Sequence, residues 1–409
     1  MTTKFPAIDR RQVLAGISAL PLATALPRPL FAQSGDIPLG MVLPFSGATG
    51  PYGPDMRKAA ELAVKTINDA GGVLGGRKLQ LFIEDSETNP TAGVAATKKL
   101  LEVNKVELVG GFWGSPIALA AKPIIISANK VQMLSCAADA VTKDNPKDLI
   151  FRFQAKSTQW GPAGAKVMDS IGAKKVTILA QQNPFVVAMI EPFKEEMAKR
   201  GGSVTDVVMY NPDQPSYRAE VEKAFGPEPD GVFCLSLLTD FVAIAKEIYR
   251  GGFTSKIVAL SIGADAEGQF LKSIEPEAAE GIYHLQPSPS LESPAYAKFV
   301  KAMGAPEGSV FLFAGNAWDQ ICVTALAMEH AKTQEAAQWA KSIRAIANPP
   351  GEDVDDIVKA LELVRGGKDI NFIGAAATCD FDERGDQLNR SFYVQVIKNG
   401  RNERIGTVS

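Results

Sequence analysis

Residues 37–84 read IPLGMVLPFSGATGPYGPDMRKAAELAVKTINDAGGVLGGRKLQLFIE, and this stretch contains a complete strand–helix–strand unit. The apolar run Ile37–Leu43 predicts one buried strand, and Lys78–Glu84 predicts a second. Between them, Met56–Ala70 has apolar residues three and four positions apart, which predicts an amphipathic helix ending at Gly71-Gly72. Strands that alternate with helices at this spacing lie parallel in one sheet, so the stretch indicates an α/β fold.

The alternation continues along the chain and then restarts. The first series runs to Met133–Ser135, and the second runs from a helix at Trp160–Ser170 to a strand at Ile257–Ser261. No short fixed-period repeat relates the two series, so a solenoid is not indicated. Two successive α/β series imply two similar lobes with parallel sheets.

The C-terminal quarter has a different pattern. Gln286–Pro289 is rich in proline and is expected to be a connection. Helices are expected at Ala295–Met303, Ala314–Ala331, Glu335–Ala347 and Asp353–Val364, the last with Asp353, Asp355 and Asp356 in its first turn. Two antiparallel strands are expected at Ala377–Phe381 and Ser391–Lys398, joined by the turn-like sequence DERGD.

The composition excludes several classes of protein. The chain has 409 residues, of which 46% are hydrophobic, with 43 Lys and Arg against 46 Asp and Glu. A formal net charge of −3 argues against nucleic-acid binding, which usually needs a concentrated basic face. The ample apolar content argues against disorder. Two histidines, His284 and His330, leave little for a His-based metal site, and no cofactor is expected.

Four cysteines are widely spaced among apolar or small neighbours, without a C-x-x-C pair: Cys136, Cys234, Cys322 and Cys379. We expect buried free thiols, because a disulfide framework is rare in so long a chain. One disulfide pair remains an alternative.

The N-terminal segment, from Met1 to Ala32, has the pattern of an export signal. Arg10-Arg11 precede a short apolar stretch that Pro21 interrupts, and the sequence LFAQ predicts cleavage after Ala32. The pattern DRRQVL resembles the twin-arginine signal, and an ordinary Sec signal is the alternative. Either signal places the mature protein in the periplasm. The segment carries a net charge of +3, so its removal leaves a formal charge of −6.

Catalytic motifs are absent from the sequence. Neither a dinucleotide fingerprint, a P-loop nor a G-x-S-x-G elbow is present. Ser127–Lys130 matches S-x-x-K but lacks the companion motifs of a serine acylase. Nothing assembles a nucleophile, a base and an oxyanion site, so reversible binding is favoured over catalysis.

Ligands of open parallel sheets bind beyond the carboxyl ends of the strands. Three such segments are Pro44–Gly53, Gly110–Pro116 and Cys136–Asp139. Tyr52 and Trp113 could stack on an apolar or planar ligand, although packing in the core is an equal alternative for either ring. Ser115, directly before Pro116, is a candidate helix N-cap.

Several motifs carry a resemblance to a known family. The segments Gly50–Leu79 and Glu84–Pro90, the late helix Trp318–Glu329 and the tail CDFDERGD at Cys379–Asp386 followed by FYVQVIKNG closely resemble periplasmic leucine/isoleucine/valine-type binding proteins. The resemblance implies a type I periplasmic binding protein, with two Rossmann-like lobes joined by three hinge crossovers. These would fall near Phe153–Gln154, Gln286–Pro287 and Phe372–Gly374. The first lobe would comprise residues 37–153 and 287–372, and the second lobe would comprise residues 154–286 and 373–409.

The amino-acid-binding signature of that family is largely not kept. The family's carboxylate-binding Ser aligns with Gly114, next to Ser115, and a Thr further on aligns with Asp139. The acidic residue for the α-amino group aligns with Ile262, with Asp265 close by. Both positions of the family's disulfide are replaced, by Glu87 and Trp113. The ligand-binding residues implied by the resemblance and the loop positions are Tyr52, Trp113, Gly114, Ser115, Ala138, Asp139, Phe185, Leu237 and Asp265.

These residues favour a ligand with an apolar or aromatic body, such as an aromatic or other carboxylate or an amide. The resemblance implies a monomeric solute-binding protein that delivers this ligand to the permease subunits of an ABC importer. A branched-chain-type amino-acid binder, a ligand-sensing receptor module of the same fold and a secreted enzyme are the alternatives.

Overall fold

The computed structural model describes residues 1–2, 35–265, 268–287, 291–388 and 391–408. Nearly all of the expected export signal, from Met1 to Ala32, lies outside the described residues, so the signal stays a prediction. Among the helices that are described, none is long and apolar enough to cross a membrane.

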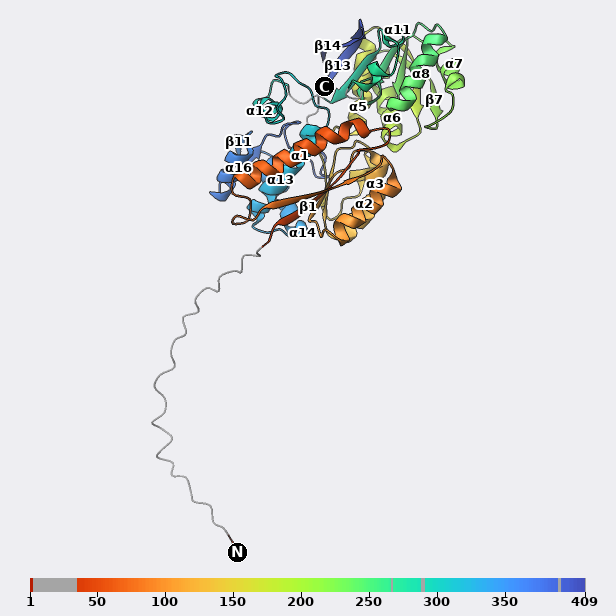
Figure 1. The fold of residues 1–409 in the computed structure, drawn as a ribbon. Coiled ribbons are helices and arrows are strands. Elements are labelled where there is room, and N and C mark those ends of the chain that lie inside the picture. The colour runs from red at the N-terminus through yellow and green to blue at the C-terminus, as the bar shows by residue number, and fades with distance from the viewer. Residues whose placement is uncertain (3–34, 266–267, 288–290, 389–390, 409) are drawn as a thin grey trace. The chain divides into compact units, whose positions relative to one another are not determined.

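Five parallel strands form the first sheet, in the order β2-β1-β3-β4-β5 (Figure 1). The strands are β1 (Ile37–Leu43), β2 (Leu79–Asp85), β3 (Leu108–Gly111), β4 (Val131–Leu134) and β5 (Ile150–Arg152). The segments between them contain η2 (Gly50–Tyr52), α1 (Gly53–Asp69), α2 (Pro90–Glu102), α3 (Ser115–Ser127) and α4 (Ala140–Lys143). We call this sheet and the elements packed on it the first lobe.

Seven strands form the second sheet, in the order β14-β13-β10-β9-β8-β6-β7. The strands are β6 (Lys175–Gln181), β7 (Ser203–Tyr210), β8 (Gly231–Leu235), β9 (Lys256–Leu260), β10 (Tyr283–Pro287), β13 (Phe392–Lys398) and β14 (Arg401–Val408). The helices are α5 (Ser157–Ser170), α6 (Pro184–Lys199), α7 (Arg218–Phe225), α8 (Leu238–Arg250), α9 (Ser261–Ala264), α10 (Gln269–Lys272) and α11 (Pro276–Ala279). We call this sheet and its helices the second lobe.

The chain returns to the first lobe after β10. The returning elements are α12 (Pro294–Ala302), α13 (Ala314–Ala331), α14 (Ala336–Trp339), η3 (Ala340–Ser342), α15 (Ile343–Ala347), β11 (Glu352–Val354), α16 (Ile357–Arg365) and β12 (Ile370–Phe372). The helix α13 is buried along most of its length and packs beside α1, although the two helices are far apart in the sequence (Figure 1). The expected α/β class with two parallel-strand sheets is therefore confirmed.

Three expectations for the C-terminal quarter were wrong. Residues 286–289 are not only a connection, because Gln286 and Pro287 end strand β10. Residues 353–364 are not one helix: Asp353 lies in β11, and Asp356 caps α16 by accepting from the N–H groups of Val358 and Lys359.

The strand expected at Ala377–Phe381, as the antiparallel partner of Ser391–Lys398, was also wrong. Residues 377–381 lie outside the named strands, and β13 pairs with β10 on one side and β14 on the other. The DERGD sequence does form a turn, in which the N–H of Gly385 donates to the carbonyl of Asp382 at 3.0 Å. Charged residues in β14 hid its strand character, since edge strands often carry charge.

The residues before β13 pack on the first lobe. The carboxylate of Asp319 in α13 accepts from the N–H groups of Ala375 and Ala376, and the ring of Phe381 contacts that of Phe151 in β5 at 5.5 Å. The expected lobe boundary at residue 373 stays a prediction.

Glycine is required where the first loop enters α1. A Cβ at Gly53 would lie 1.8 Å from the carbonyl oxygen of Pro44. The G-P-Y-G sequence can therefore fold back on the end of β1 only with glycine at this position. The fold also buries all four cysteines as free thiols, as expected.

Candidate functional site

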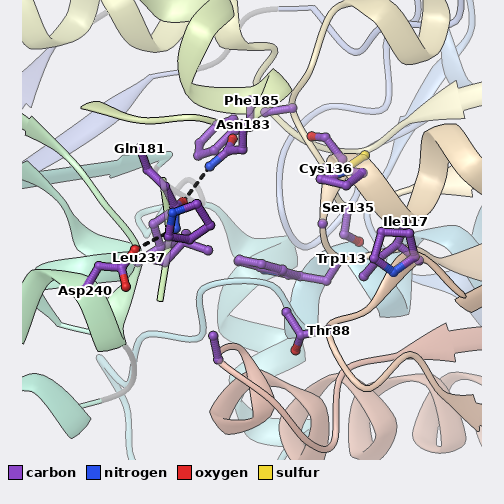
Figure 2. A pocket seen from close by; sticks show the side chains of 18 of the residues that line it. Thr88, Trp113, Ile117, Ser135, Cys136, Gln181, Asn183, Phe185, Leu237 and Asp240 are labelled. Atoms are coloured by element: carbon purple, nitrogen blue, oxygen red, sulfur yellow. Dashed lines mark hydrogen bonds between the residues drawn. The ribbon is translucent and has the colours of Figure 1, made fainter. Parts of the chain in front are cut away.

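A pocket of about 240 Å³ lies where the strand ends of the two sheets meet. The first lobe contributes the loop before α3, the loop after β4 and Phe313, among others. The second lobe contributes the residues that follow β6 and β8, together with Trp160 and Ile262. In Figure 2, Asp240, Gln181 and Leu237 lie on one side of the pocket, and Ser135, Cys136 and Ile117 lie on the other.

An aromatic cluster forms part of the first-lobe wall. The ring of Trp113 stacks on Tyr52, with centroids 5.4 Å apart and planes at 15°. Phe313 packs edge-on against both rings, at 5.6 Å from Trp113 and 5.0 Å from Tyr52. Two other segments, those of Tyr52 and Phe313, hold the indole in place, so this wall is preorganised for an apolar or planar ligand.

The Trp113 indole N–H is an unsatisfied donor. The side chain is 7% exposed, and its Nε1 has no hydrogen-bond partner among the described residues. A buried donor without a partner costs about 1–3 kcal/mol. Because this nitrogen itself is buried, it faces protein atoms, and other atoms of the indole line the pocket.

The amino terminus of α3 lies beside this indole. Gly114 caps the helix with φ 103°, a conformation that favours glycine. Ser115 is therefore not the N-cap that we expected. Its Oγ instead accepts from the N–H of Ala138 at 3.0 Å, which ties α3 to the loop after β4. The first N–H groups of a helix carry partial positive charge and favour a ligand acceptor.

A buried arginine holds the loop after β4. Nη1 of Arg152 donates to the carbonyl of Cys136 at 3.1 Å, and Nη2 donates to the carbonyl of Ala138 at 2.9 Å and to Thr142 Oγ1. Its Nε donates to Asp386 at 2.7 Å, and both side chains are buried. The C=O and N–H of a trans peptide point in opposite directions. Because the carbonyl of Cys136 faces Arg152, the N–H of Ala137 in the same peptide faces away from it. Cys136 and Ala137 both line the pocket.

The thiol of Cys136 stays protonated. Burial raises the pKa of Cys136 to about 11, against the opposing effects of Arg152 and a hydrogen bond from Ser115. The pocket therefore contains a neutral thiol rather than a reactive thiolate near neutral pH.

The second-lobe wall combines apolar side chains with a chain of hydrogen bonds. Phe185 packs edge-on against the buried Trp160 at 5.5 Å, and Leu237 and Ile262 also line the pocket. Nδ2 of Asn183 donates to Gln181 Oε1 at 2.6 Å, and Nε2 of Gln181 donates to Asp240 Oδ2 at 2.8 Å (Figure 2).

Asp240 receives two further hydrogen bonds. The hydroxyl of Tyr217 donates to its Oδ1 at 2.6 Å, and the N–H of Asp213 donates to the same atom at 3.3 Å. Burial, followed by the hydrogen bond to this carboxylate, raises the pKa of Tyr217 well above its usual value. The phenol therefore stays protonated and donates.

Five of the nine expected site residues line the pocket: Trp113, Gly114, Ser115, Phe185 and Leu237. Tyr52 lies behind Trp113 as its stacking partner rather than on the lining.

The other three expected residues do not line the pocket. The N–H of Ala138 donates to Ser115 Oγ, and its carbonyl accepts from Arg152 Nη2. Asp139 accepts from the N–H and hydroxyl of Thr158 and so joins the start of α5. Asp265 accepts from Gly268 N–H and Asn402 Nδ2, whereas Ile262, the position that aligns with the family's acidic residue, lines the pocket.

The sequence analysis missed several lining residues, notably Trp160, Gln181, Asn183, Asp240 and Phe313. A usable signal existed for three of them. Gln181, Asn183 and Asp240 lie at or just beyond the carboxyl ends of β6 and β8, where ligands of parallel sheets bind. The three loops expected from the sequence to bind ligand all follow first-lobe strands, so the equivalent loops of the second lobe were missed.

The pocket is electrostatically unusual. Its lining contains two carboxylates, Asp213 and Asp240, and no Lys, Arg or His within the described part of the chain. Across the same residues, no group of three His, Cys, Asp or Glu side chains is arranged to hold a metal. The charge of Arg152, behind the loop after β4, is neutralised by Asp386.

A family model described as "Periplasmic binding protein" matches residues 36–401. The chain belongs to the periplasmic binding protein family. The fold and family are those of solute-binding proteins rather than enzymes. Among curated relatives, the Leu/Ile/Val-binding protein BraC3 of Rhizobium johnstonii is 24% identical over 394 residues, which cover 95% of this chain and 96% of the relative.

Solved structures give the same fold. The leucine-binding protein LivK of Thermotoga maritima has a TM-score of 0.76 and 21% identity, over 91% of this chain and 98% of LivK. A solute-binding protein of an ABC transporter from R. palustris, in complex with benzoate, has a TM-score of 0.72 and 18% identity, over 91% of this chain and 96% of that protein. These likenesses confirm the type I periplasmic binding fold.

Loss of the Arg152–Asp386 pair should destabilise the protein. We expect Asp386→Ala to lower the free energy of unfolding by about 3–5 kcal/mol, because it leaves a buried guanidinium without its counter-charge. Urea unfolding measures this. The control is Asp355→Ala, which breaks the solvent-exposed pair with Lys298 and should cost less than about 1 kcal/mol. Equal losses in both variants would contradict the role given to Arg152.

The Trp113 ring should contribute to ligand binding. We expect Trp113→Phe to weaken the binding of any pocket ligand about tenfold, because a phenyl ring offers the ligand less apolar surface than an indole. Calorimetry with a ligand found by screening measures the change. Trp339→Phe is the matched control, because Trp339 is also buried with an unpartnered Nε1 but lies outside the pocket lining. Equal weakening by both substitutions would remove Trp113 from the site.

Proposed function

We propose that this chain is the extracytoplasmic solute-binding protein of an ABC importer. It binds a small organic ligand between the two lobes and delivers it to the membrane permease subunits. The observation that carries this proposal is the pocket itself, which both lobes line and which contains aromatic walls but no catalytic constellation among its described residues. Family membership supports the proposal.

The ligand class follows from the lining. Trp113, Trp160, Phe185 and Phe313 offer ring surfaces to an apolar or aromatic body. The partial positive charge of the first turn of α3 suits an acceptor group, so an aromatic or other carboxylate, or an amide, fits the first-lobe wall. The benzoate-bound neighbour supports an aromatic ligand for this fold.

A branched-chain-type amino acid is the second candidate. It is favoured by the similarity to Leu/Ile/Val-binding relatives and to LivK. It is disfavoured by the replacement of the expected acidic residue at the pocket by Ile262.

The mature protein acts as a monomer in the periplasm after removal of the segment from Met1 to Ala32. The DRRQVL sequence supports export by the twin-arginine route. A sensory module of the same fold would have the same kind of pocket. Binding of the protein to its permease subunits distinguishes a transport protein from such a module.

A thermal-shift screen tests the function. The set comprises amino acids, aromatic acids, fatty acids, amides and ureas. A ligand that binds only the folded state at 100 times its Kd stabilises it by about 2.7 kcal/mol, so the melting temperature should rise by a few degrees. The ligand should be recovered unchanged. Turnover of the ligand, or no shift with any compound, would contradict the proposal.

Small-angle scattering tests closure. We expect the radius of gyration to fall when ligand is added, because hinge closure brings the lobes together around it. An unchanged radius of gyration at saturating ligand would contradict closure.

A further inference from the structure

Thr88 lines the pocket, and its backbone has a conformation that is unusual for a β-branched residue (Figure 2). Both Glu87 and Thr88 have φ 51°, in the left-handed region that residues other than glycine rarely adopt. Such a conformation persists only where the surrounding contacts impose it, and it is often found at functional sites. The contacts that hold Thr88 between β2 and α2 therefore indicate what this residue does.

The hydroxyl of Thr88 is fully used by the loop after β1. Its single proton goes to the carbonyl of Ser46 at 2.7 Å, because a carbonyl can only accept. The hydroxyl of Thr49 must therefore donate to Thr88 Oγ1, at 2.8 Å, and the N–H of Thr49 donates to the same atom at 3.3 Å. A hydroxyl has one donor and two acceptor positions, so all three are occupied. Thr88 thus lines the pocket without a hydrogen-bonding position left for a ligand.

The loops after β1 and β2 are also joined elsewhere. A Cβ at Gly47 would lie 2.6 Å from the carbonyl oxygen of Glu87 and 2.8 Å from Thr88 Cβ, so the two backbones are in close contact. Oδ1 of Asp85, at the end of β2, accepts from the N–H of Phe45 at 2.9 Å and from the N–H of Glu87 at 2.8 Å. The two loops therefore form one hydrogen-bonded unit.

Thr49 connects this unit to the aromatic wall of the pocket. It is buried and is the N-cap residue of η2, and its carbonyl accepts from the N–H of Tyr52 at 3.2 Å. The ring of Tyr52 in turn stacks on Trp113. A displacement of Thr49 would therefore change the support of the indole that lines the pocket.

We propose that Thr88 is a positioning residue for ligand binding. Its hydroxyl holds Thr49, and through Thr49 and Tyr52 it fixes the ring of Trp113 in the pocket wall. The effect of Thr88 on a ligand is thus indirect and depends on the hydroxyl. This inference rests on the proposed solute-binding function, but the position of the Trp113 ring can be measured without a ligand.

Fluorine NMR of protein labelled with 5-fluorotryptophan tests the positioning. The chain has four Trp residues, and Trp113→Phe assigns the resonance of Trp113. Thr88→Val should shift or broaden this resonance, because it removes all three hydrogen bonds and keeps the β-branched shape. Thr88→Ser should leave the resonance in place, because it keeps the hydroxyl. An unchanged Trp113 resonance in Thr88→Val would overturn the inference.

Two further variants separate the hydroxyl from other effects. The backbone conformation at Thr88 suits glycine, so a role limited to backbone shape predicts no change in Thr88→Gly. We expect Thr88→Gly to displace the Trp113 resonance as Thr88→Val does. Thr97→Val is the matched control, because the buried Thr97 hydroxyl donates to the carbonyl of Gly93 within α2 and the residue does not line the pocket. A resonance that stays in place in Thr88→Gly, or that moves equally in Thr97→Val, would count against the hydroxyl.

Calorimetry with benzoate, the ligand of a structural neighbour, tests the consequence for binding. Affinity should fall about tenfold in Thr88→Val and Thr88→Gly, because the wall is no longer preorganised. It should stay within about twofold of the unmodified protein in Thr88→Ser and Thr97→Val. Equal affinity in Thr88→Val and the unmodified protein would overturn the role in binding, even if the Trp113 resonance moved.

The two readouts separate this inference from the proposed function. If benzoate does not bind the unmodified protein, the Trp113 resonance decides the inference alone. Failure of every compound in the thermal-shift screen would contradict the proposed function and would leave the measured position of the ring as it is.

Discussion

The contacts of the Arg152 guanidinium hold together the part of the first lobe on which the site depends. One side chain joins the end of β5, the loop after β4 and the C-terminal turn at Asp386. Without the arginine, the carbonyl of Cys136 would lose its donor, the carbonyl of Ala138 would keep only the N–H of Val141, and the loop that lines the pocket would lose its anchor. Such a pair need not add stability relative to an apolar core, but removal of one partner leaves the other buried and uncompensated. The tail of the chain therefore helps to set the geometry of a loop that lies far earlier in the sequence.

The two walls of the pocket are chemically different. The first lobe supplies a stacked indole and the first turn of α3, and the second lobe supplies rings and a carboxylate that accepts three hydrogen bonds. Closure of the lobes around a ligand would bring both walls into contact with it. This would couple recognition to the conformational change that we propose for transport.

The fold was largely predictable from sequence, whereas the site was predictable only in part. The alternation of strands and helices has a strong period, so β1, α1 and the parallel sheets followed from local patterns. The helix expected at residues 353–364 was wrong because acidic residues favour a helix start wherever they stand, and only tertiary pairing of β11 with β12 reveals the strand. Charged residues concealed β14 for a related reason.

Trp113 and Ser115 were found because they follow a first-lobe strand, and Phe185 and Leu237 were found through the family resemblance. Asp240 was missed because its role comes from contacts with Gln181 and Tyr217, which are distant in the sequence. Asp265 was expected instead because it is acidic and lies near the aligned position. Its carboxylate is used by Gly268 and Asn402, and no local pattern predicts that choice.

The most direct measurement is a crystal structure of the protein with its tightest-binding ligand. The account predicts that the ligand lies between Trp113 and Phe185, in contact with both lobes. A ligand bound outside this pocket, or one in contact with a single lobe, would contradict it.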